Sequence, residues 1–315
     1  MDIKNISYAL FKGFYDSIKG MLAVFILDKE IKERKLKRQS PTRTNSIRQK
    51  PFDGKDSTKK QSKDEDSKLM SRILQCAVFN GGVFLLSIVF FEYLFIPMWV
   101  KDTGEGSWSR TAIFLLFLYR LIWITPIFTL SKILNTIWFQ DIADLAYRHS
   151  RGRPVYTKKW SLIGADCLFS IIIQLLFLLQ AVAVSYIPIY VVGYILSFVQ
   201  MCMLYSLYAF EYKWFNMGWE IHRRLSFIEA NWPYFIGFGM PMTLITQFWD
   251  SWMVSGCVFS ILFPFYIISG NEASPVISGE LPLRFFAPTI FVSNCIFSCT
   301  IGSPQKPAKT QTAER

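Results

Sequence analysis

Four ionisable residues stand inside long apolar stretches of this sequence: Glu92, Arg120, Asp166 and Asp250. A charge inside a bilayer is costly, so we expect such residues to pair with one another, to mark an ion path or to reach the membrane surface. Glu92 and Arg120 can form an ion pair if their two segments pack antiparallel, and such a pair serves packing or orientation as readily as function. Asp166 stands at the start of its segment, where it can cap a helix. Asp250 stands at a hairpin tip, within reach of headgroup water.

The most regular polar pattern runs from Asn135 to Arg148. On a helix, Asp141, Asp144 and Arg148 share one face, and Asp144 and Arg148 have the spacing of a surface pair. Two aspartates can bind a cation, but the further oxygen ligands of a calcium loop are missing. We therefore favour a solvated face or a partner-binding face over a metal site. The candidate partner surface comprises Trp138, Gln140, Asp141, Asp144, Glu211, Trp214, Asn231 and Trp232.

No pattern in the sequence indicates an enzyme. The GxSxG elbow, the HExxH zinc motif, the Walker loop and the glycine-rich dinucleotide turn are all missing. The chain has 2 histidines and 6 cysteines, and the cysteines stand in apolar runs without a CxxC pair. A zinc site and a disulfide framework are therefore not expected. We predict no catalytic residues, no metal and no cofactor.

Five apolar runs occupy most of the chain after residue 72. They cover residues 73–100, 111–131, 161–210, 233–271 and 285–301, and each contains at most one charge. About 20 apolar residues suffice to cross the roughly 30 Å of hydrocarbon in a bilayer. Without an alternating strand pattern, only helices satisfy every backbone group there. The sequence therefore predicts an all-α, multi-pass integral membrane protein with about six membrane helices.

These runs set the predicted boundaries. We expect a cytosolic amphipathic and charged helix at residues 1–38, a disordered basic linker at 39–72, a membrane domain at 73–301 and a cytosolic tail at 302–315. The membrane helices are expected at about 73–100, 111–134, 161–186, 189–210, 233–270 (as a hairpin) and 283–301. The turn at residues 185–188 contains no charge, so the hairpin there either crosses the bilayer or penetrates it only partway.

Residues 3–26 have the periodicity of a helix with one apolar face. That face consists of Ile3, Ile6, Leu10, Phe14, Ile18, Met21 and Phe25, at steps of three and four residues. Lys12, Asp16 and Lys19 fall on the opposite face. Such a helix either lies in the headgroup plane or packs on the membrane domain, and the sequence does not separate the two.

The positive charge of the chain is concentrated before the first apolar run. The net charge is +11, and residues 1–72 contain 18 Lys or Arg against 10 Asp or Glu. This placement follows the positive-inside rule and indicates a cytosolic N-terminus facing anionic lipid. No nucleic-acid-binding signature accompanies the charge. We expect the bilayer as a partner, no nucleic acid, and a cytosolic C-terminus.

Five stretches of the sequence resemble the family of etoposide-induced protein 2.4 homologues, called ectopic P granules proteins in nematodes. The stretches are Val78–Phe84, Trp138–Ala146, Leu204–Asn216, Asn231–Gly239 and Phe259–Pro264. They occur in the family's order between about residues 70 and 275. Arg120 departs from the family's apolar second span, so a family-wide role for a Glu92–Arg120 pair is not expected.

This resemblance implies a membrane protein of the endoplasmic reticulum that is required for autophagy. The implied step is the maturation of early autophagosomal structures into degradative autolysosomes, and the vertebrate members are also tied to growth suppression and apoptosis. The wider superfamily includes the bacterial CysZ sulfate-uptake proteins, which combine two long spanning helices with helix pairs that penetrate partway.

Three functional hypotheses follow. The preferred one is a non-enzymatic scaffold in autophagy that binds other membrane or autophagy proteins through residues 138–148 and 211–232. The alternative is an anion permease or channel, with Arg120 and the glycine-interrupted residues 233–249 along the path. The third is lipid handling at membrane contact sites through the N-terminal helix. Assembly of the chain into a homo-oligomer stays open.

Overall fold

The computed structural model describes residues 3–39, 71–90, 94, 98, 114, 117–119, 121–122, 125–151, 160–249, 251–277 and 282–301. Within these residues the structure consists of helices joined by turns and short loops, with no strand. Three of the described helices are long and apolar enough to cross a membrane: Gly164–Ser185, Val191–Asn216 and Trp252–Glu272. The described part is therefore all-α, as predicted, whereas the total of six membrane helices stays a prediction.

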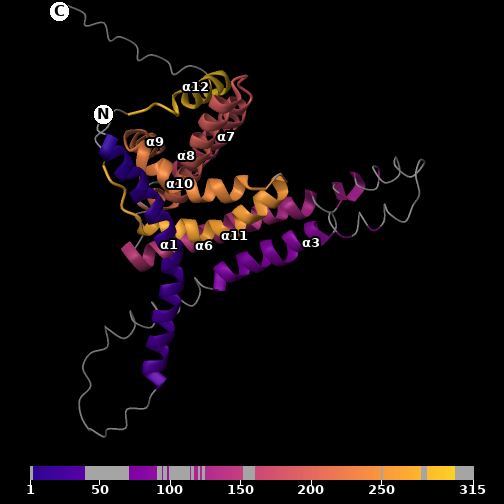
Figure 1. Cartoon of the computed structure of the whole chain (residues 1–315), viewed down its shortest axis with the longest axis vertical. Coiled ribbons are helices and arrows are strands. Elements are labelled where there is room, and N and C mark those ends of the chain that lie inside the picture. Colours follow the sequence, from indigo (N-terminus) through magenta and orange to yellow (C-terminus); the bar gives the residue numbers. More distant parts are fainter. Residues whose placement is uncertain are drawn as a thin grey trace, which may run out of the picture.

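Two helical hairpins form the centre of the molecule. The first joins α7 (Trp160–Ser185) to α8 (Tyr190–Asn216), and the chain reverses between them close to Pro188. The second joins α10 (Trp232–Gln247) to α11 (Trp252–Glu272). A short helix, α9 (Ile221–Ala230), links the hairpins, and α8 packs against both α10 and α11. Figure 1 shows that the two hairpins diverge from the region around α9.

A second group of helices lies along α11. It consists of α6 (Thr125–Arg151), the π-helical segment η1 (Val78–Leu85) and the short α3 (Leu86–Val89), and both α6 and η1 pack against α11. In Figure 1 these elements project together to the right. The C-terminal helix α12 (Ala287–Ile301) packs instead against α7. The fold therefore has two arms that meet where α8, α10 and α11 contact one another.

A buried amide pair joins η1 to α6. Asn80 Nδ2 donates to Asn135 Oδ1 at 2.8 Å, and Asn135 Nδ2 donates back to Asn80 Oδ1 at 3.0 Å. Ser131 Oγ adds a third bond to Asn80 Oδ1 at 2.9 Å. Asn80 is 1% exposed and Asn135 is 2% exposed. Polar bonds of this kind hold membrane helices together, because lipid offers the amides no alternative partner.

We expect Asn80→Ala to destabilise the fold by about 1–3 kcal/mol, because it leaves the amide of Asn135 buried without its partner. Thermal unfolding of the detergent-solubilised chain measures the loss. Asn135→Ala should then add little in the double variant, since both changes remove the same interaction. Gln75→Ala, which changes an exposed amide one turn before Asn80, is the matched control. Additive losses from Asn80→Ala and Asn135→Ala would contradict the pairing.

The N-terminal helix α1 (Ile3–Gln39) packs against both α10 and α11. Its buried residues are mostly small: Ala9, Gly13, Asp16, Ser17 and Gly20. Of the predicted apolar face, Ile3 and Ile18 are exposed, and Leu10 and Phe14 are only half-buried. Small residues let two backbones approach closely, which is the usual basis of helix packing in membranes.

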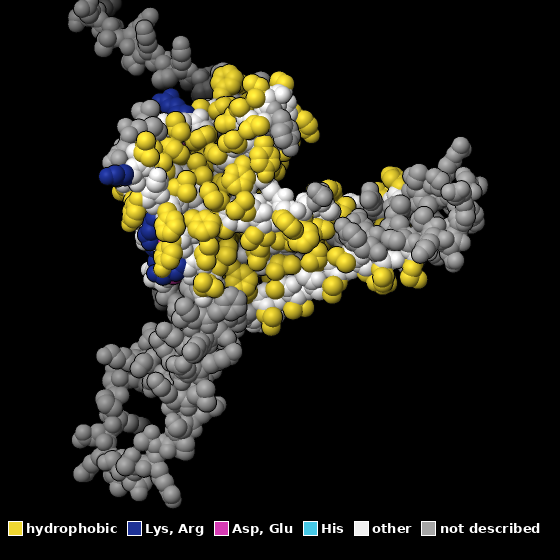
Figure 2. Space-filling model, viewed as in Figure 1, with side chains coloured by type: hydrophobic (Ala, Val, Ile, Leu, Met, Phe, Trp, Pro, Cys, Tyr) yellow, Lys and Arg dark blue, Asp and Glu magenta, His cyan; other side chains and the backbone are white. Residues whose placement is uncertain are grey.

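Large apolar side chains cover the outside of the helices. On α7, Leu168, Ile171, Leu175 and Leu179 are each more than half exposed. Figure 2 shows hydrophobic side chains over most of the visible face, with Lys and Arg gathered along one edge. A soluble protein rarely exposes such a surface. We conclude that these helices face lipid, and that the protein is an integral membrane protein.

Candidate functional site at the charged ends of the helices

The charged side chains of the described helices gather at one end. Residues 167–210 contain no charge, so the turn between α7 and α8 and most of both helices are uncharged. The charges of this region stand near the start of α7, at the end of α8, directly before α9 and within α9. They are Asp166, Glu211, Lys213, Glu220, Arg223, Arg224 and Glu229. Polar chemistry is therefore confined to the ends of the helices next to α9.

A glycine turn places α9 at this end. Gly218 has a φ of 71°, a conformation that side chains with a Cβ disfavour. The N–H of Gly218 donates to Phe215 O, and the N–H of Trp219 donates to Trp214 O, both at 2.9 Å. Trp214 and Trp219 stack with their rings 5.7 Å apart and nearly parallel. Together these features form a Schellman motif, which ends α8 and reverses the chain into α9.

The buried arginine of α9 holds two acidic residues from different helices. Arg224 is 1% exposed, and its Nη2 lies 3.0 Å from Asp166 Oδ2 of α7. Its Nη1 lies 3.2 Å from Glu211 Oε1 of α8. Its Nε and Nη2 also donate to the carbonyl oxygen of Trp219, at 2.9 and 2.6 Å. The arginine therefore links α7, α8 and α9 in one ionic cluster.

Ser170 of α7 completes this cluster. Its hydroxyl donates to Glu211 Oε1 and accepts a hydrogen bond from Gln174 Nε2 at 3.1 Å. Buried charges are tolerated only when they are paired and hydrogen-bonded, and all three ions of this cluster meet that condition. The arrangement is suited to fixing the angle between the first hairpin and α9.

The structure places the sequence candidates Asp166 and Glu211 in this one cluster. Asp166 lies six residues after the start of α7, so its carboxylate does not cap that helix and instead accepts from Arg224. Glu211 contacts Arg224 and Ser170 inside the protein. Sequence analysis did not single out Arg224, because it stands in a short polar segment next to another arginine. The signal available was two carboxylates at the edges of apolar runs, which require a cation.

Other residues of the candidate partner surface differ in accessibility. Trp214 is 2% exposed and Asn231 is 3% exposed, so both pack inside the chain. Trp232 and Trp138 are half-buried, and Trp138 meets Phe79 edge to face, with ring centroids 5.7 Å apart. Gln140, Asp141 and Asp144 are also only partly buried. Accessible polar groups therefore remain mainly on α6.

A buried lysine joins α8 to the end of α11. Lys213 Nζ donates to Ala273 O at 2.6 Å and to Gly270 O at 3.2 Å. The side chain is 6% exposed. Carbonyl groups at a helix C-terminus have no partner within the helix, and a cation there also complements the helix dipole. Lys213 therefore fixes the end of α11 beside the end of α8.

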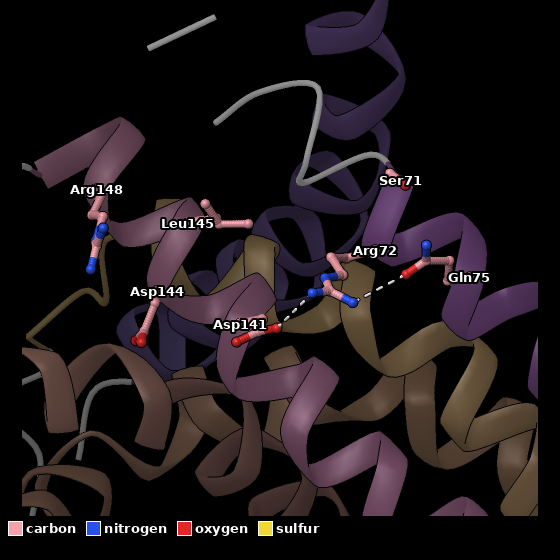
Figure 3. Close-up of a pocket in the computed structure, with 7 residues that line it drawn as sticks. All are labelled: Ser71, Arg72, Gln75, Asp141, Asp144, Leu145 and Arg148. Atoms are coloured by element: carbon pink, nitrogen blue, oxygen red, sulfur yellow. Dashed lines mark hydrogen bonds and ion pairs between the residues drawn. The ribbon is translucent and has the colours of Figure 1, made fainter. Parts of the chain in front are cut away.

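A groove opens on α6 at the same end of the molecule. It has a volume of about 610 Å³ and lies between helical residues 71–77 and α6. Its lining residues are Ser71, Arg72, Gln75, Asp141, Asp144, Leu145 and Arg148. Figure 3 shows Arg72 reaching from helical residues 71–77 toward Asp141 of α6, with Gln75 on its other side. We call this feature the α6 groove.

The charges of the α6 groove are only loosely satisfied. Arg72 Nη2 lies 3.5 Å from Asp141 Oδ2, and both side chains are more than 40% exposed, so the pair adds little stability. Asp144 accepts from Gln140 at 2.9 Å and from Asn216 of α8 at 3.1 Å. Burial raises the pKa of the Asp144 carboxyl, against the opposing effects of these hydrogen bonds and of Arg148. The groove thus offers both signs of charge to a partner.

Three candidates from the sequence, Glu92, Arg120 and Asp250, lie outside the described residues. The ion pair between Glu92 and Arg120 therefore stays a prediction. Within the described residues, no group of three or more His, Cys, Asp or Glu side chains could hold a metal ion. The described chemistry of the helix ends is ion pairing and hydrogen bonding.

Comparison with known proteins identifies similar chains. Residues 65–248 match the family described as sulfate transporter CysZ/etoposide-induced protein 2.4. Ectopic P granules protein 4 of Caenorhabditis elegans is 28% identical over 274 residues, which cover 85% of this chain and 83% of that protein. A protein EI24 homolog of Arabidopsis thaliana is 29% identical over 274 residues, covering 71% of this chain and 85% of that protein. No solved structure matches the chain.

The family match contains the polar features just described. It includes the ionic cluster around Arg224, the glycine turn at Gly218 and the whole α6 groove, whereas α1 (Ile3–Gln39), α11 and α12 lie outside it. A protein EI24 homolog of Dictyostelium discoideum is also similar, at 26% identity over 237 residues, which cover 71% of this chain and 75% of that protein.

Proposed function

We propose that this chain, which belongs to the sulfate transporter CysZ/etoposide-induced protein 2.4 family, is a membrane protein that acts in autophagy without enzymatic activity. The observation that carries the proposal is the match over residues 65–248, together with similarity to ectopic P granules protein 4 over 85% of the chain. In finer detail, we propose residence in the endoplasmic reticulum and action when autophagosomes mature into degradative autolysosomes. We place the N- and C-termini in the cytosol.

The proposed mode of action is protein binding at the charged end of the helices. The α6 groove supports this proposal, because Arg72, Asp141 and Arg148 are accessible there and the first two form only an exposed pair. Rim charges of this kind steer and select a partner more than they add affinity. The ionic cluster around Arg224 would fix the position of α8, whose Asn216 contacts Asp144 of the α6 groove.

Deletion of the gene tests the function directly. We expect autophagic substrates to accumulate, together with autophagosomal structures that fail to become degradative, and re-expression of the chain to restore clearance. Normal clearance of protein aggregates in the deletion strain would overturn the autophagy proposal. The same strain then serves as the host for variants of the groove.

We expect the double variant Asp141→Arg/Arg148→Glu to restore clearance several-fold less well than the unchanged chain, at equal expression and with the same intracellular distribution. Reversal of both charges alters the field that a partner meets while leaving the number of charges the same. Arg284→Ala, which removes an exposed charge elsewhere at this end, should restore clearance fully. Full activity of the double variant would remove the groove from the proposal and leave the autophagy role intact.

Anion transport is the alternative function, and the family description, which includes a sulfate transporter, is the observation that favours it. The glycines of residues 233–249 argue against that path, because Gly237 and Gly239 are covered by neighbouring backbone. A Cβ on Gly237 would lie 1.9 Å from Leu10 O, and one on Gly239 would lie 1.8 Å from Cys202 O. Purified protein in liposomes that passes neither sulfate, chloride nor phosphate would reject transport.

A further inference from the structure

We propose that residues 3–22 of α1 lie on the membrane surface and bind the headgroups of anionic phospholipids. The side of α1 that faces away from the rest of the protein carries the binding groups. This role goes beyond the function proposed above, and it concerns a helix outside the family match. It rests on how α1 is rotated, on what its outward side carries and on where it crosses the other helices.

Close packing fixes the rotation of α1. A Cβ on Gly13 would lie 2.1 Å from Tyr234 O of α10, and one on Gly20 would lie 2.3 Å from Ser269 Oγ of α11. Ser269 Oγ also donates to Ser17 O at 2.8 Å. Backbone contact this close leaves no room for a larger side chain or for a turned helix. The inward side of α1 is therefore set, and so is its outward side.

The outward side of α1 is apolar and aromatic. Its large exposed residues are Ile3 (77%), Tyr8 (60%), Phe11 (67%), Tyr15 (49%), Ile18 (37%) and Leu22 (55%). Aromatic and aliphatic side chains on a helix surface lodge at the boundary between headgroups and acyl chains. Tyrosine suits that depth because its ring is apolar and its hydroxyl is polar.

The charges of residues 3–22 are sorted by sign between the two sides. The acidic Asp16 points inward, where it accepts from Tyr234 OH at 2.9 Å and pairs with Lys12 at 2.5 Å. Lys4 and Lys19 are exposed. Lys12 and Lys19 each lie within 6 Å of the ring of Tyr15. A surface that combines cations with aromatic rings is complementary to anionic headgroups.

The position of α1 sets the depth at which these groups lie. In Figure 1, α1 crosses α10 and α11 at a steep angle, close to α9. The contacts agree, because Gly13 meets the first turn of α10 and Gly20 meets the last turn of α11. The start of α10 directly follows α9, and the end of α11 is held by Lys213 of α8, so both ends lie beside the charged residues. A helix crossing there runs along the membrane surface and across the direction of the spanning helices, with its lysines at headgroup level.

Lipid titration of the purified full-length chain in neutral detergent tests the proposal. We expect fluorescent phosphatidylserine to bind more tightly than fluorescent phosphatidylcholine. Each lysine near an anionic surface contributes about fivefold in affinity. The variant Lys4→Gln/Lys19→Gln should therefore bind phosphatidylserine about 25-fold more weakly, with phosphatidylcholine unchanged. It retains Lys12, so the pair with Asp16 stays intact.

The matched control is Arg223→Gln/Arg284→Gln, which removes the same charge from exposed positions at the same end but away from α1. We expect its phosphatidylserine affinity to stay within about twofold of the unchanged chain, since its α1 face is unaltered. Equal losses in the two double variants, or equal binding of the two lipids by the unchanged chain, would overturn the proposal. So would soluble phosphoserine that competes as well as the lipid does, because that result indicates a site for free anions.

A second measurement locates the outward side without changing charge. The Phe11→Cys variant is labelled with an environment-sensitive dye in a chain that retains only the buried cysteines Cys76, Cys202 and Cys257, with its other native cysteines replaced by serine. The labelled protein is placed in phosphatidylserine nanodiscs. Lipids with a quencher near the headgroup should quench the dye more strongly than a water-soluble quencher does. Preferential quenching from water would overturn the proposal. Shielding of the dye from both quenchers, together with cross-links between copies of the protein, would also overturn the proposal. That result would indicate that a second copy of this chain covers the outward side of α1.

Discussion

Replacing Arg224 with methionine is expected to lower the free energy of unfolding by about 3–5 kcal/mol, which makes it one of the two most damaging single changes that we expect. The arginine is 1% exposed and holds Asp166 and Glu211 at 3.0 and 3.2 Å. Methionine fills much of the same volume but leaves both carboxylates without their cation inside the protein, and that situation carries a penalty of this size. Thermal unfolding of the detergent-solubilised chain should show a fall of roughly 10 °C.

Two further variants separate the ionic effect from a packing effect. Arg223→Met changes the neighbouring arginine, which is exposed and stacks 4.1 Å above the Trp219 ring, so its loss should not exceed about 1 kcal/mol. The triple variant Arg224→Met/Asp166→Asn/Glu211→Gln removes all three charges and should regain most of the lost stability. If neutralising the two acids regained nothing, the unpaired charges would not be the cause of the loss.

The second large effect is expected from Gly239→Ala. A Cβ at this position would lie 1.8 Å from Cys202 O, so α8 and α10 would have to move apart. Both contacting groups are backbone, and neither can turn away as a flexible side chain can. We expect a loss of about 3 kcal/mol, at the upper end of the usual cost of overpacking. Thermal unfolding and the yield of monodisperse protein measure the loss.

Glycines elsewhere supply the controls for Gly239→Ala. A Cβ on Gly164 of α7 would meet nothing within 4 Å, so Gly164→Ala should be neutral or stabilise by up to about 1 kcal/mol through helix propensity. Gly237→Ala meets Leu10 O of α1, so its cost should disappear in a chain that lacks residues 1–39. The cost of Gly239→Ala should persist in that shortened chain. Equal costs for Gly164→Ala and Gly239→Ala would contradict close contact between α8 and α10.

The sequence predicted the helical, membrane-embedded character of the chain because that property depends on local composition. Long uncharged runs favour membrane helices over strands. The run at 161–210 is long enough for two such helices, and Pro188 marks the turn between them. The ionic cluster could not be predicted in the same way. Asp166, Glu211 and Arg224 come from three helices, and their meeting depends on the reversal at Gly218. The sequence indicates that a buried carboxylate needs a cationic partner, but it does not indicate which residue provides that cation.

The N-terminal helix illustrates a different difficulty. The prediction selected the face with the largest apolar residues, as is appropriate for a helix that packs on a core in water. In lipid, large apolar residues gain nothing by leaving the surface, and close contact between backbones decides which face packs. The packed residues are accordingly Ala9, Gly13, Ser17 and Gly20. The spacing of these small residues was present in the sequence, and in a membrane protein such spacing indicates the side on which a helix packs.

The contacts of α1 with α10 and α11 can form only late in the synthesis of the chain. The partners Asp16 and Tyr234 are 218 residues apart. At a synthesis rate of about 5–20 residues per second, roughly 10–45 s pass between the synthesis of Asp16 and that of Tyr234. Helix α1 is therefore made well before α10 and α11, against which it packs. In a chain whose synthesis stops before α10 and α11, the side of α1 that carries Gly13 and Gly20 therefore lacks the helices that cover it.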